Sequence, residues 1–345
     1  LDSRLTSRAD ELTLREWNIE GYTKLGFRLP KVSGFVGLRI AGEDRKGSLG
    51  GGLGDFFRSG SELLTSASLR YAPARDHELS LTHSSSYTRP SYRDLLGYTS
   101  VASAAFLRKG NSGLRTSYRR GLSLNYTYMR AAQLELSYTD TEDPIVEAML
   151  PMLGGGLVLR RYNLDYSRTL RALLVLPLPL VSQKKFSWLA LTILAAQRQW
   201  DAGRIETNDY SAALNTQFVQ HRHSFSLPSD WTVDLGVTYY SGVLYELYRI
   251  QRQWWIDASV SKRMGNLRAT LSARDPFNTN IARGSYNPVV NGLAFERNWH
   301  SPRLELTISY SWGKKSVKAQ DTRARYDDLK RLTTGASEGM NTPVQ

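Results

Sequence analysis

The sequence predicts an all-β protein, a transmembrane antiparallel up-and-down β-barrel of which about thirteen strands are present. Three observations predict it. Apolar and polar residues alternate with a period of two in many segments, aromatic residues lie near the ends of these segments, and short links between segments alternate with long ones. Barrels that cross a bilayer combine these three features, with short turns on one side and long loops on the other.

The alternation is clearest near the carboxy terminus, where Leu304, Ile308 and Trp312 belong to one apolar set separated by polar residues. Side chains two apart share a strand face, so this strand has one apolar and one polar face. Many segments approach the roughly 9–11 residues that cross a bilayer when tilted. The expected strands are Trp17–Leu29, Phe35–Ala41, Leu63–Tyr71, Leu79–Tyr87, Leu122–Tyr128, Leu134–Tyr138, Tyr162–Leu176, Phe186–Trp200, Tyr210–Leu227, Trp231–Tyr239, Trp254–Lys262, Leu267–Ala273 and Leu304–Trp312.

The links between the expected strands fall into two length classes. Short links are expected at Pro30–Lys31, Pro73–His77, Arg130–Ala132, Pro228–Asp230 and Met264–Asn266. Long links are expected at Gly42–Glu62, Thr88–Gly113, Asp140–Gly156 and Pro276–His300. We expect the short links in the periplasm and the long ones outside the cell. A soluble β-sandwich is disfavoured because it needs no such alternation and rarely sustains strands this long.

Composition narrows the class of partner. The 345 residues include no cysteine and carry a formal charge of +13. The basic residues recur singly rather than in one stripe, which disfavours a nucleic-acid partner and suits a polar lumen or an anionic lipid surface. The longest apolar run, Ala172–Val181, is too short for a membrane helix and contains two prolines.

Strand parity predicts that the chain is part of a larger barrel. If the last strand ends in the periplasm, counting back places the start of Trp17–Leu29 outside the cell. Bacterial single-chain barrels have even strand numbers and periplasmic termini. We therefore expect upstream strands, unless the count is wrong by one. No signal peptide is visible at Leu1–Arg4, which also favours a fragment.

Three ordered motifs resemble those of TonB-dependent receptors. Tyr87–Leu95 (YTRPSYRDL) resembles the aromatic-x-Arg-x-Pro-Ser signature, and Gly110–Arg115 (GNSGLR) resembles the segment that begins the next strand, with Ser112 where the family has proline. The run from Leu267 through Asp-Pro-Phe-Asn resembles the penultimate strand and its closing motif. The last strand, with Tyr310 and Trp312, resembles the signal read by the barrel-assembly machinery.

The resemblance implies the carboxy-terminal part of a barrel of about 22 strands in the outer membrane of a Gram-negative bacterium. Residues 1–313 would form barrel wall and residues 314–345 a polar periplasmic tail. The implied function is import of a specific nutrient ligand, driven by TonB through an upstream plug that is not in this chain. The other implied partners are outer-membrane lipid, lipopolysaccharide and the barrel-assembly machinery. The sequence does not identify the ligand and implies no cofactor.

Candidate ligand-binding residues are Arg89, Tyr92 and Arg93, at the mouth of a long loop. They would meet an anionic ligand, or they anchor the loop or face lipopolysaccharide phosphates. His221 and His223 share a strand face and could hold a metal, but no third ligand has a defined spacing, so no metal site is predicted.

No residue is predicted to be catalytic, and the protein is not expected to be an enzyme. His83 lies beside several serines, but none is marked as a nucleophile. The glycine-rich run Gly47–Gly54 lacks the ending of a phosphate-binding loop and is expected to be a flexible loop. Two alternatives stay open: a complete barrel of about 14 strands acting as a porin or secretion-associated channel, and, less favoured, an outer-membrane hydrolase.

Overall fold

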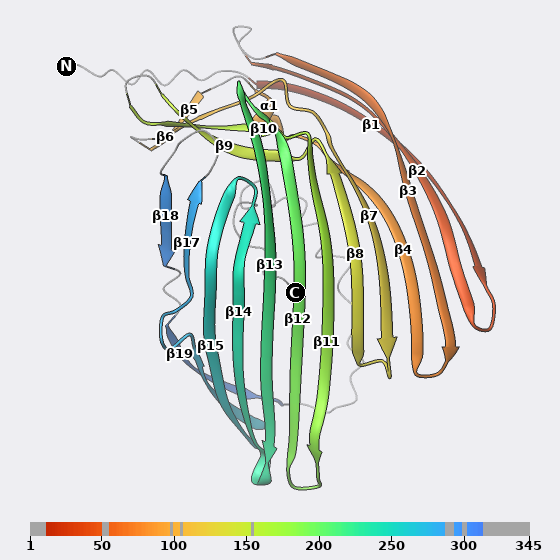
Figure 1. Ribbon diagram of the computed structural model, residues 1–345, viewed down its shortest axis with the longest axis vertical. Helices are drawn as coiled ribbons and strands as arrows, with labels where there is room; N and C mark the ends of the chain where they lie inside the picture. Colours follow the sequence, from red (N-terminus) through yellow and green to blue (C-terminus); the bar gives the residue numbers. More distant parts are fainter. Residues whose placement is uncertain are drawn as a thin grey trace.

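The computed structural model describes residues 12–49, 55–96, 99–103, 106–152, 155–286, 293–298 and 302–312 (Figure 1). The expected tail at residues 314–345 and most of the glycine-rich run lie outside these residues. Within the described part, no helix is long and apolar enough to cross a membrane.

The chain forms one long, curved wall of antiparallel strands (Figure 1). Among the described residues, each expected strand has a counterpart in the wall, and each lies beside the next expected strand. The expected strand Tyr162–Leu176 is divided, because Tyr162 and Asn163 end a strand of a second sheet and the wall strand begins at Tyr166. The wall strands are β1 (Leu12–Arg28), β2 (Val32–Leu49), β3 (Phe56–Ala74), β4 (His77–Thr88), β7 (Ser117–Tyr128), β8 (Ala132–Glu142), β11 (Tyr166–Ser182), β12 (Ser187–Ile205), β13 (Asn208–Leu227), β14 (Trp231–Tyr245), β15 (Tyr248–Met264), β16 (Leu267–Arg274) and β19 (Arg303–Tyr310). Most are longer than expected, up to the 20 residues of β13.

All five expected short links lie at one end of the wall, which we call the turn end. It also holds the β11–β12 link, and the 3-10 turn η1 (Pro228–Asp230) joins β13 to β14 there. The other end, the loop end, carries the long links (Figure 1). It also holds two links of two residues each, between β12 and β13 and between β14 and β15, so short links are not confined to the turn end. Two expected loops prove shorter, because β2 and β3 extend into Gly42–Glu62 and β8 and a further strand occupy much of Asp140–Gly156. Strand pairing satisfies the backbone polar groups of these segments, which an open loop would leave to water.

The two faces of the wall differ as the period of two predicts. Val237 lies opposite Ile256, and Leu271 lies opposite Leu306, so apolar residues line up across strands on the outer face. Val237, Leu271 and Leu306 are exposed, Ile256 is partly exposed, and Trp312 is 89% exposed. Polar residues line up in the same way on much of the inner face, as Thr82 does opposite Ser123, whereas in β11 and β12 the inner face toward the turn end is apolar, with Val175 opposite Ile193. An exposed apolar face of this extent suits contact with lipid.

The two edge strands do not pair with each other in the described part of the chain. There, β1 pairs only with β2, and β19 pairs only with β16. Pairing of Trp17–Leu29 with Leu304–Trp312 would have supported the smaller closed barrel, and it is not found among these residues.

Elements not expected from the sequence gather at the loop end. A second sheet has the order β5 (Thr99–Ser103), β6 (Phe106–Lys109), β10 (Leu157–Asn163), β9 (Ile145–Pro151), and we call it the loop sheet. The short helix α1 (Tyr92–Leu95) lies in the link before β5, while β17 (Ile281–Tyr286) and β18 (Ala294–Asn298) extend the wall beside β15. A hydrophobic core joins the loop sheet to the upper wall through residues such as Val146, Leu164, Ile205 and Leu247.

Candidate functional site

The link after β4 turns sharply at the loop end because its residues cap a short helix. Ser91 is the N-cap of α1, and its hydroxyl accepts a hydrogen bond from the Asp94 amide at 3.2 Å. Leu95 and Leu96 are buried and pack against Phe56 and Leu114. This small core fixes the link against the upper end of β3, so the motif residues lie on a docked segment.

Arg89 lies against the first two strands of the wall. Its Nε is 2.7 Å from Glu43 Oε2, its Nη1 donates to Asn18 Oδ1 at 3.1 Å, and its guanidinium stacks on the ring of Tyr87. Burial raises the pKa of Glu43, and the guanidinium groups of Arg89 and Arg45 oppose that rise. The principal contacts of Arg89 therefore hold the loop to the wall.

Tyr92 makes a second set of anchoring contacts. Its hydroxyl donates to Glu16, and the Arg45 guanidinium carbon lies 4.3 Å from its ring centroid. Arg45 is 5% exposed and also reaches the carbonyl oxygen of Pro90 at 3.4 Å. A buried arginine needs such partners, because an uncompensated charge away from water is costly.

Arg93 differs from its two neighbours in the motif because its side chain is exposed. Of the three loop-mouth candidates, Arg89 and Tyr92 lie in one network with Glu16 and Glu43, whereas Arg93 lies on the surface of α1. The sequence located the segment and left open whether it meets an anionic ligand, anchors the loop or faces lipopolysaccharide phosphates. The acidic partners lie more than 40 residues earlier in the chain, so no local spacing could have identified them.

Gly110 and Asn111 hold the later part of the same link, before β7, in place. A Cβ at Gly110 would lie 1.5 Å from the carbonyl oxygen of Leu96, so only glycine permits this approach. The backbone amide of Asn111 donates to Asp94 O, and its side-chain amide donates to Arg161 O at 2.8 Å. This motif joins α1 to β10 and thus ties the link to the loop sheet.

The loop sheet is attached to the wall at the free edge of β9. The amide of Glu147 donates to Glu246 Oε2 at 3.1 Å, and the amide of Met149 donates to the Tyr286 hydroxyl at 2.7 Å. Burial raises the pKa of Glu246, against the stabilising hydrogen bond from Glu147, and burial raises the pKa of Tyr286 to about 12. Side chains of the wall thus accept hydrogen bonds from amides at the edge of β9 that have no partner within the loop sheet.

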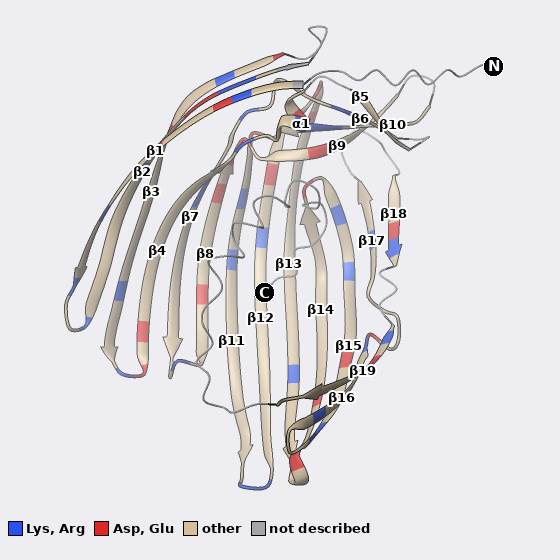
Figure 2. Cartoon of the chain, turned by 180° about the vertical axis from the view of Figure 1, so that it is seen from behind, with Lys and Arg blue, Asp and Glu red and all other residues tan. Residues whose placement is uncertain are grey.

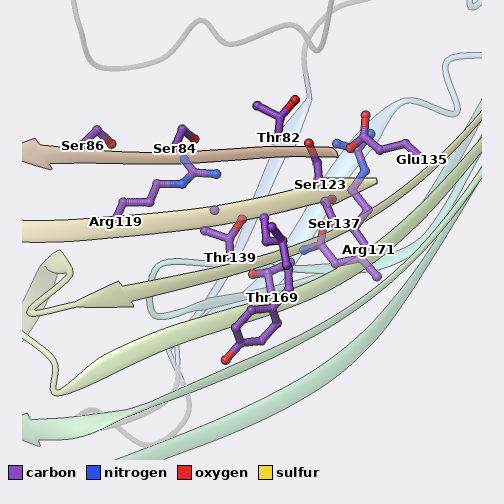
Figure 3. A pocket seen from close by; sticks show the side chains of 14 residues that line it. Thr82, Ser84, Ser86, Arg119, Ser123, Glu135, Ser137, Thr139, Thr169 and Arg171 are labelled. Atoms are coloured by element: carbon purple, nitrogen blue, oxygen red, sulfur yellow. The ribbon is translucent and has the colours of Figure 1, made fainter. Parts of the chain in front are cut away.

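A polar hollow of about 570 Å³ lies on the inner face of the wall between β4 and β12 (Figure 3). Hydroxyl groups dominate its lining, with Arg119, Glu135 and Arg171 as its charged groups. The hydroxyl-bearing residues are Thr82, Ser84, Ser86, Ser123, Ser137, Tyr138, Thr139 and Thr169. Such a surface offers many donors and acceptors and little net charge. Figure 2 shows that charged residues gather at the two ends of the wall and occur singly between them.

His221 and His223 lie on the outer face, opposite Val237 and Leu235. Trp188 Nε1 donates to His223 Nδ1 at 2.9 Å, and the two imidazole Nε2 atoms are 3.0 Å apart. Indole is only a donor, so the proton of His223 lies on Nε2 and points at His221. His221 Nδ1 then donates to Thr192 Oγ1 at 2.8 Å. In this series of hydrogen bonds, all four imidazole nitrogens of His221 and His223 have protein partners.

No group of three or more His, Cys, Asp or Glu side chains in the described ranges could hold a metal ion. His83 pairs with Thr65 Oγ1 at 2.9 Å on the outer face, while Ser84 faces inward and lines the hollow. Ser85 shares the outer face, but its hydroxyl donates to Thr65 O at 3.0 Å. The neighbouring serines therefore do not converge on this imidazole as a nucleophile and base would.

Comparison with known proteins places the fold. The family model described as "Outer membrane protein beta-barrel family" matches residues 3–310. The copper transporter OprC shares 12% sequence identity with a TM-score of 0.58, over 86% of this chain and 47% of that one. A variant of the ferric enterobactin receptor PfeA from Pseudomonas aeruginosa shares 12% identity with a TM-score of 0.52, over 87% of this chain and 54% of that one. The chain thus spans about half the length of these structures. A search of curated proteins found no significant match.

Proposed function

Because the chain belongs to the outer membrane protein β-barrel family, we propose that it forms the ligand-specific wall and outer loops of an energised nutrient importer of the TonB-dependent type. The observation that carries the proposal is the contrast between the two faces of the wall. The outer face is apolar and exposed, and the inner face holds a hydroxyl-lined hollow beneath a docked loop sheet. This arrangement suits passage of a polar ligand through a membrane.

The energy source and the assembly route are part of the proposal. The motifs Tyr87–Leu95 and Gly110–Arg115 support a TonB-dependent receptor, in which a plug domain couples the barrel to TonB. Tyr310 is the last residue of the final wall strand, and Trp312 lies two residues beyond it; both side chains are exposed. In the proposal, the barrel-assembly machinery recognises them there. Lipopolysaccharide would contact the outer face near the loop end, and residues 314–345 would lie in the periplasm.

The proposed protein is a receptor and transporter rather than an enzyme. PfeA is a ferric enterobactin receptor and OprC a copper transporter, and their likeness to this chain concerns the fold. Arg93 is the loop-mouth candidate whose side chain is exposed to an approaching anionic ligand. The loop sheet would form the outer boundary of the ligand path.

Uptake by the native bacterium tests the importer. Cells with and without the gene, each with intact and deleted tonB, would be given a panel of nutrients as sole source, including ferric siderophores and Cu²⁺. The proposal expects that growth on at least one nutrient requires both genes. Passage that requires this gene but not tonB would instead support the passive porin alternative, and growth independent of this gene on every nutrient would count against both.

A further inference from the structure

A second hollow, at the turn end of the wall, has a strongly basic lining. Its volume is about 340 Å³, and its charged lining residues are Lys184, Lys185, Arg263 and Arg268, with Asp230 as the acid among them. All four basic side chains are exposed, and in the part of the chain that the structure describes none of them forms a salt bridge. The hollow therefore carries positive charge that the described residues leave largely uncompensated.

Two of these cations lie directly opposite each other on neighbouring strands. Arg263 in β15 and Arg268 in β16 are register partners, and Arg263 is two residues from Ser261, which lines the same hollow. Like charges in opposite positions destabilise a sheet. The Nε of Arg263 donates to Gly265 O at 3.3 Å, which leaves its other guanidinium nitrogens free to bind a ligand. An oxyanion between the two guanidinium groups would remove the repulsion and accept charge-assisted hydrogen bonds from both.

A row of hydroxyl groups lies across the hollow at one register. Ser187 lies opposite Ser226. Thr232 lies opposite both Ser226 and Ser261, so the row crosses β12, β13, β14 and β15. Thr232 is five positions from the outward-facing Val237, so the row faces inward. The two lysines lie beside one end of the row, in the link between β11 and β12, and the two arginines lie beside the other end.

The length of this row distinguishes between two kinds of anionic ligand. Neighbouring strands are about 4.8 Å apart, so a row across four strands is about 14 Å long. A single phosphate group would cover about one gap between strands, whereas an extended peptide advances about 3.3 Å per residue and would cover the row with four or five residues. Hydroxyl groups also suit a peptide, because they donate to its carbonyl oxygens and accept from its amides.

The position and charge of the hollow exclude two other occupants. Membrane lipid meets the apolar outer face, whereas the hollow lies on the inner face. The segment 314–345 carries seven Lys or Arg and four Asp or Glu residues, so its net charge has the same sign as the hollow. The ligand that fits the charge is an acidic segment from outside the described residues.

We propose that the turn-end hollow binds an extended acidic segment of protein. Its carboxylates pair with Lys184 or Lys185 at one end and lie between Arg263 and Arg268 at the other, and its backbone crosses the hydroxyl row. The segment belongs either to the rest of this polypeptide or to a separate protein, and the same chemistry recognises it in both cases. The inference goes beyond the proposed importer, because docking of a protein segment here requires neither TonB nor transport.

Zero-length carbodiimide cross-linking of the native full-length protein in outer-membrane vesicles tests the proposal. The reagent joins a lysine amine to a carboxylate that contacts it, and mass spectrometry of the joined peptides identifies both. Lys184 or Lys185 should be joined to an Asp or Glu residue outside the described residues, and the peptide sequence shows whether it comes from the same polypeptide or from a separate protein. Lys31, in another link of the turn end, and Lys262, over the Trp231 ring on the outer face, are matched controls that should form no such product.

A double variant tests the arginine pair. Arg263→Met with Arg268→Met should lower the yield of the Lys184 and Lys185 cross-links by about tenfold, because the segment loses its charge-assisted hydrogen bonds at one end. Arg119→Met, in the other hollow, should leave the yield unchanged. Heat-modifiable mobility verifies that each variant is folded.

Three results would overturn the inference: no carboxylate is joined to Lys184 or Lys185, Lys31 and Lys262 are joined to the same extent, or the double variant leaves the yield unchanged. Titration of the purified protein with inorganic phosphate covers the small-anion alternative. Saturable phosphate binding that the double variant abolishes, without any cross-link to protein, would assign the hollow to a small anion instead.

Discussion

Replacing Arg89 by methionine should release the link between β4 and β7 from the wall. The change keeps an unbranched side chain as far as the ε position and removes the charge that faces Glu43 across 2.7 Å. The side chains of Arg89 and Glu43 are only 18% and 9% exposed. Removing one partner of a buried pair costs about 3–5 kcal/mol because the other charge is left uncompensated. Arg45 stays 3.9 Å from Glu43, so we expect the lower end, about 3 kcal/mol.

Hydrogen exchange read by mass spectrometry measures this loss locally. A cost of about 3 kcal/mol corresponds to roughly hundredfold faster exchange in peptides covering α1 and the flanking link. Arg93→Met is the matched control, because Arg93 is an exposed residue of the same helix. Equal exchange in Arg89→Met and Arg93→Met would refute the anchoring role.

The defect should also depend on pH with a defined sign. The pKa of Glu43 is raised in the folded protein, so its contribution to stability is full below the ordinary glutamate range and falls as pH rises through the raised value. Without the guanidinium of Arg89, that pKa rises further. The Arg89→Met defect should therefore be larger near neutral pH than near pH 5. A defect that grows toward acidic pH would contradict this account.

Three further changes test other parts of the fold. Trp312→Asp should lower the yield of heat-modifiable folded barrel more than Trp312→Phe, since a charge on the lipid face is costly by an amount that depends on depth, up to a few kcal/mol for basic side chains at the midplane. Equal yields from the two variants would argue against it. Gly110→Ala should lower the free energy of unfolding by about 1–3 kcal/mol, because the added Cβ would lie 1.5 Å from the Leu96 carbonyl oxygen. In the control Gly60→Ala, the added Cβ meets only a carboxylate oxygen at 3.9 Å, so thermal unfolding should show a lower melting temperature for Gly110→Ala alone. Tyr286→Phe removes the hydroxyl that accepts a hydrogen bond from the Met149 amide in β9, so hydrogen exchange in β9 should become about tenfold faster. Unchanged exchange would show that water replaces the hydroxyl.

The strands of the wall could be predicted from the sequence because the alternation that specifies each strand is local. A period of two, as in Leu304, Leu306 and Ile308, states at once that the segment is a strand and which face is apolar. Neighbours in the chain are neighbours in the sheet, so strand order followed from chain order. Strand ends were harder to predict: β2 continues past Gly42 to Leu49, and β3 begins at Phe56, before Glu62. The run of charged residues Glu43–Lys46 in β2 conceals the alternation there.

The loop end was decided by tertiary structure. In the loop sheet, β6 pairs in parallel with β10, from a different link some 50 residues later, and no periodicity in either short strand encodes that choice. The motif at Arg89 and Tyr92 marked a segment, but its partners Glu16 and Glu43 come from β1 and β2. The contact between the rings of Phe218 and Tyr240 likewise required the register of two strands. Sequence alone determined what repeats along one strand; contacts between distant strands depend on register and docking, which only the folded chain determines.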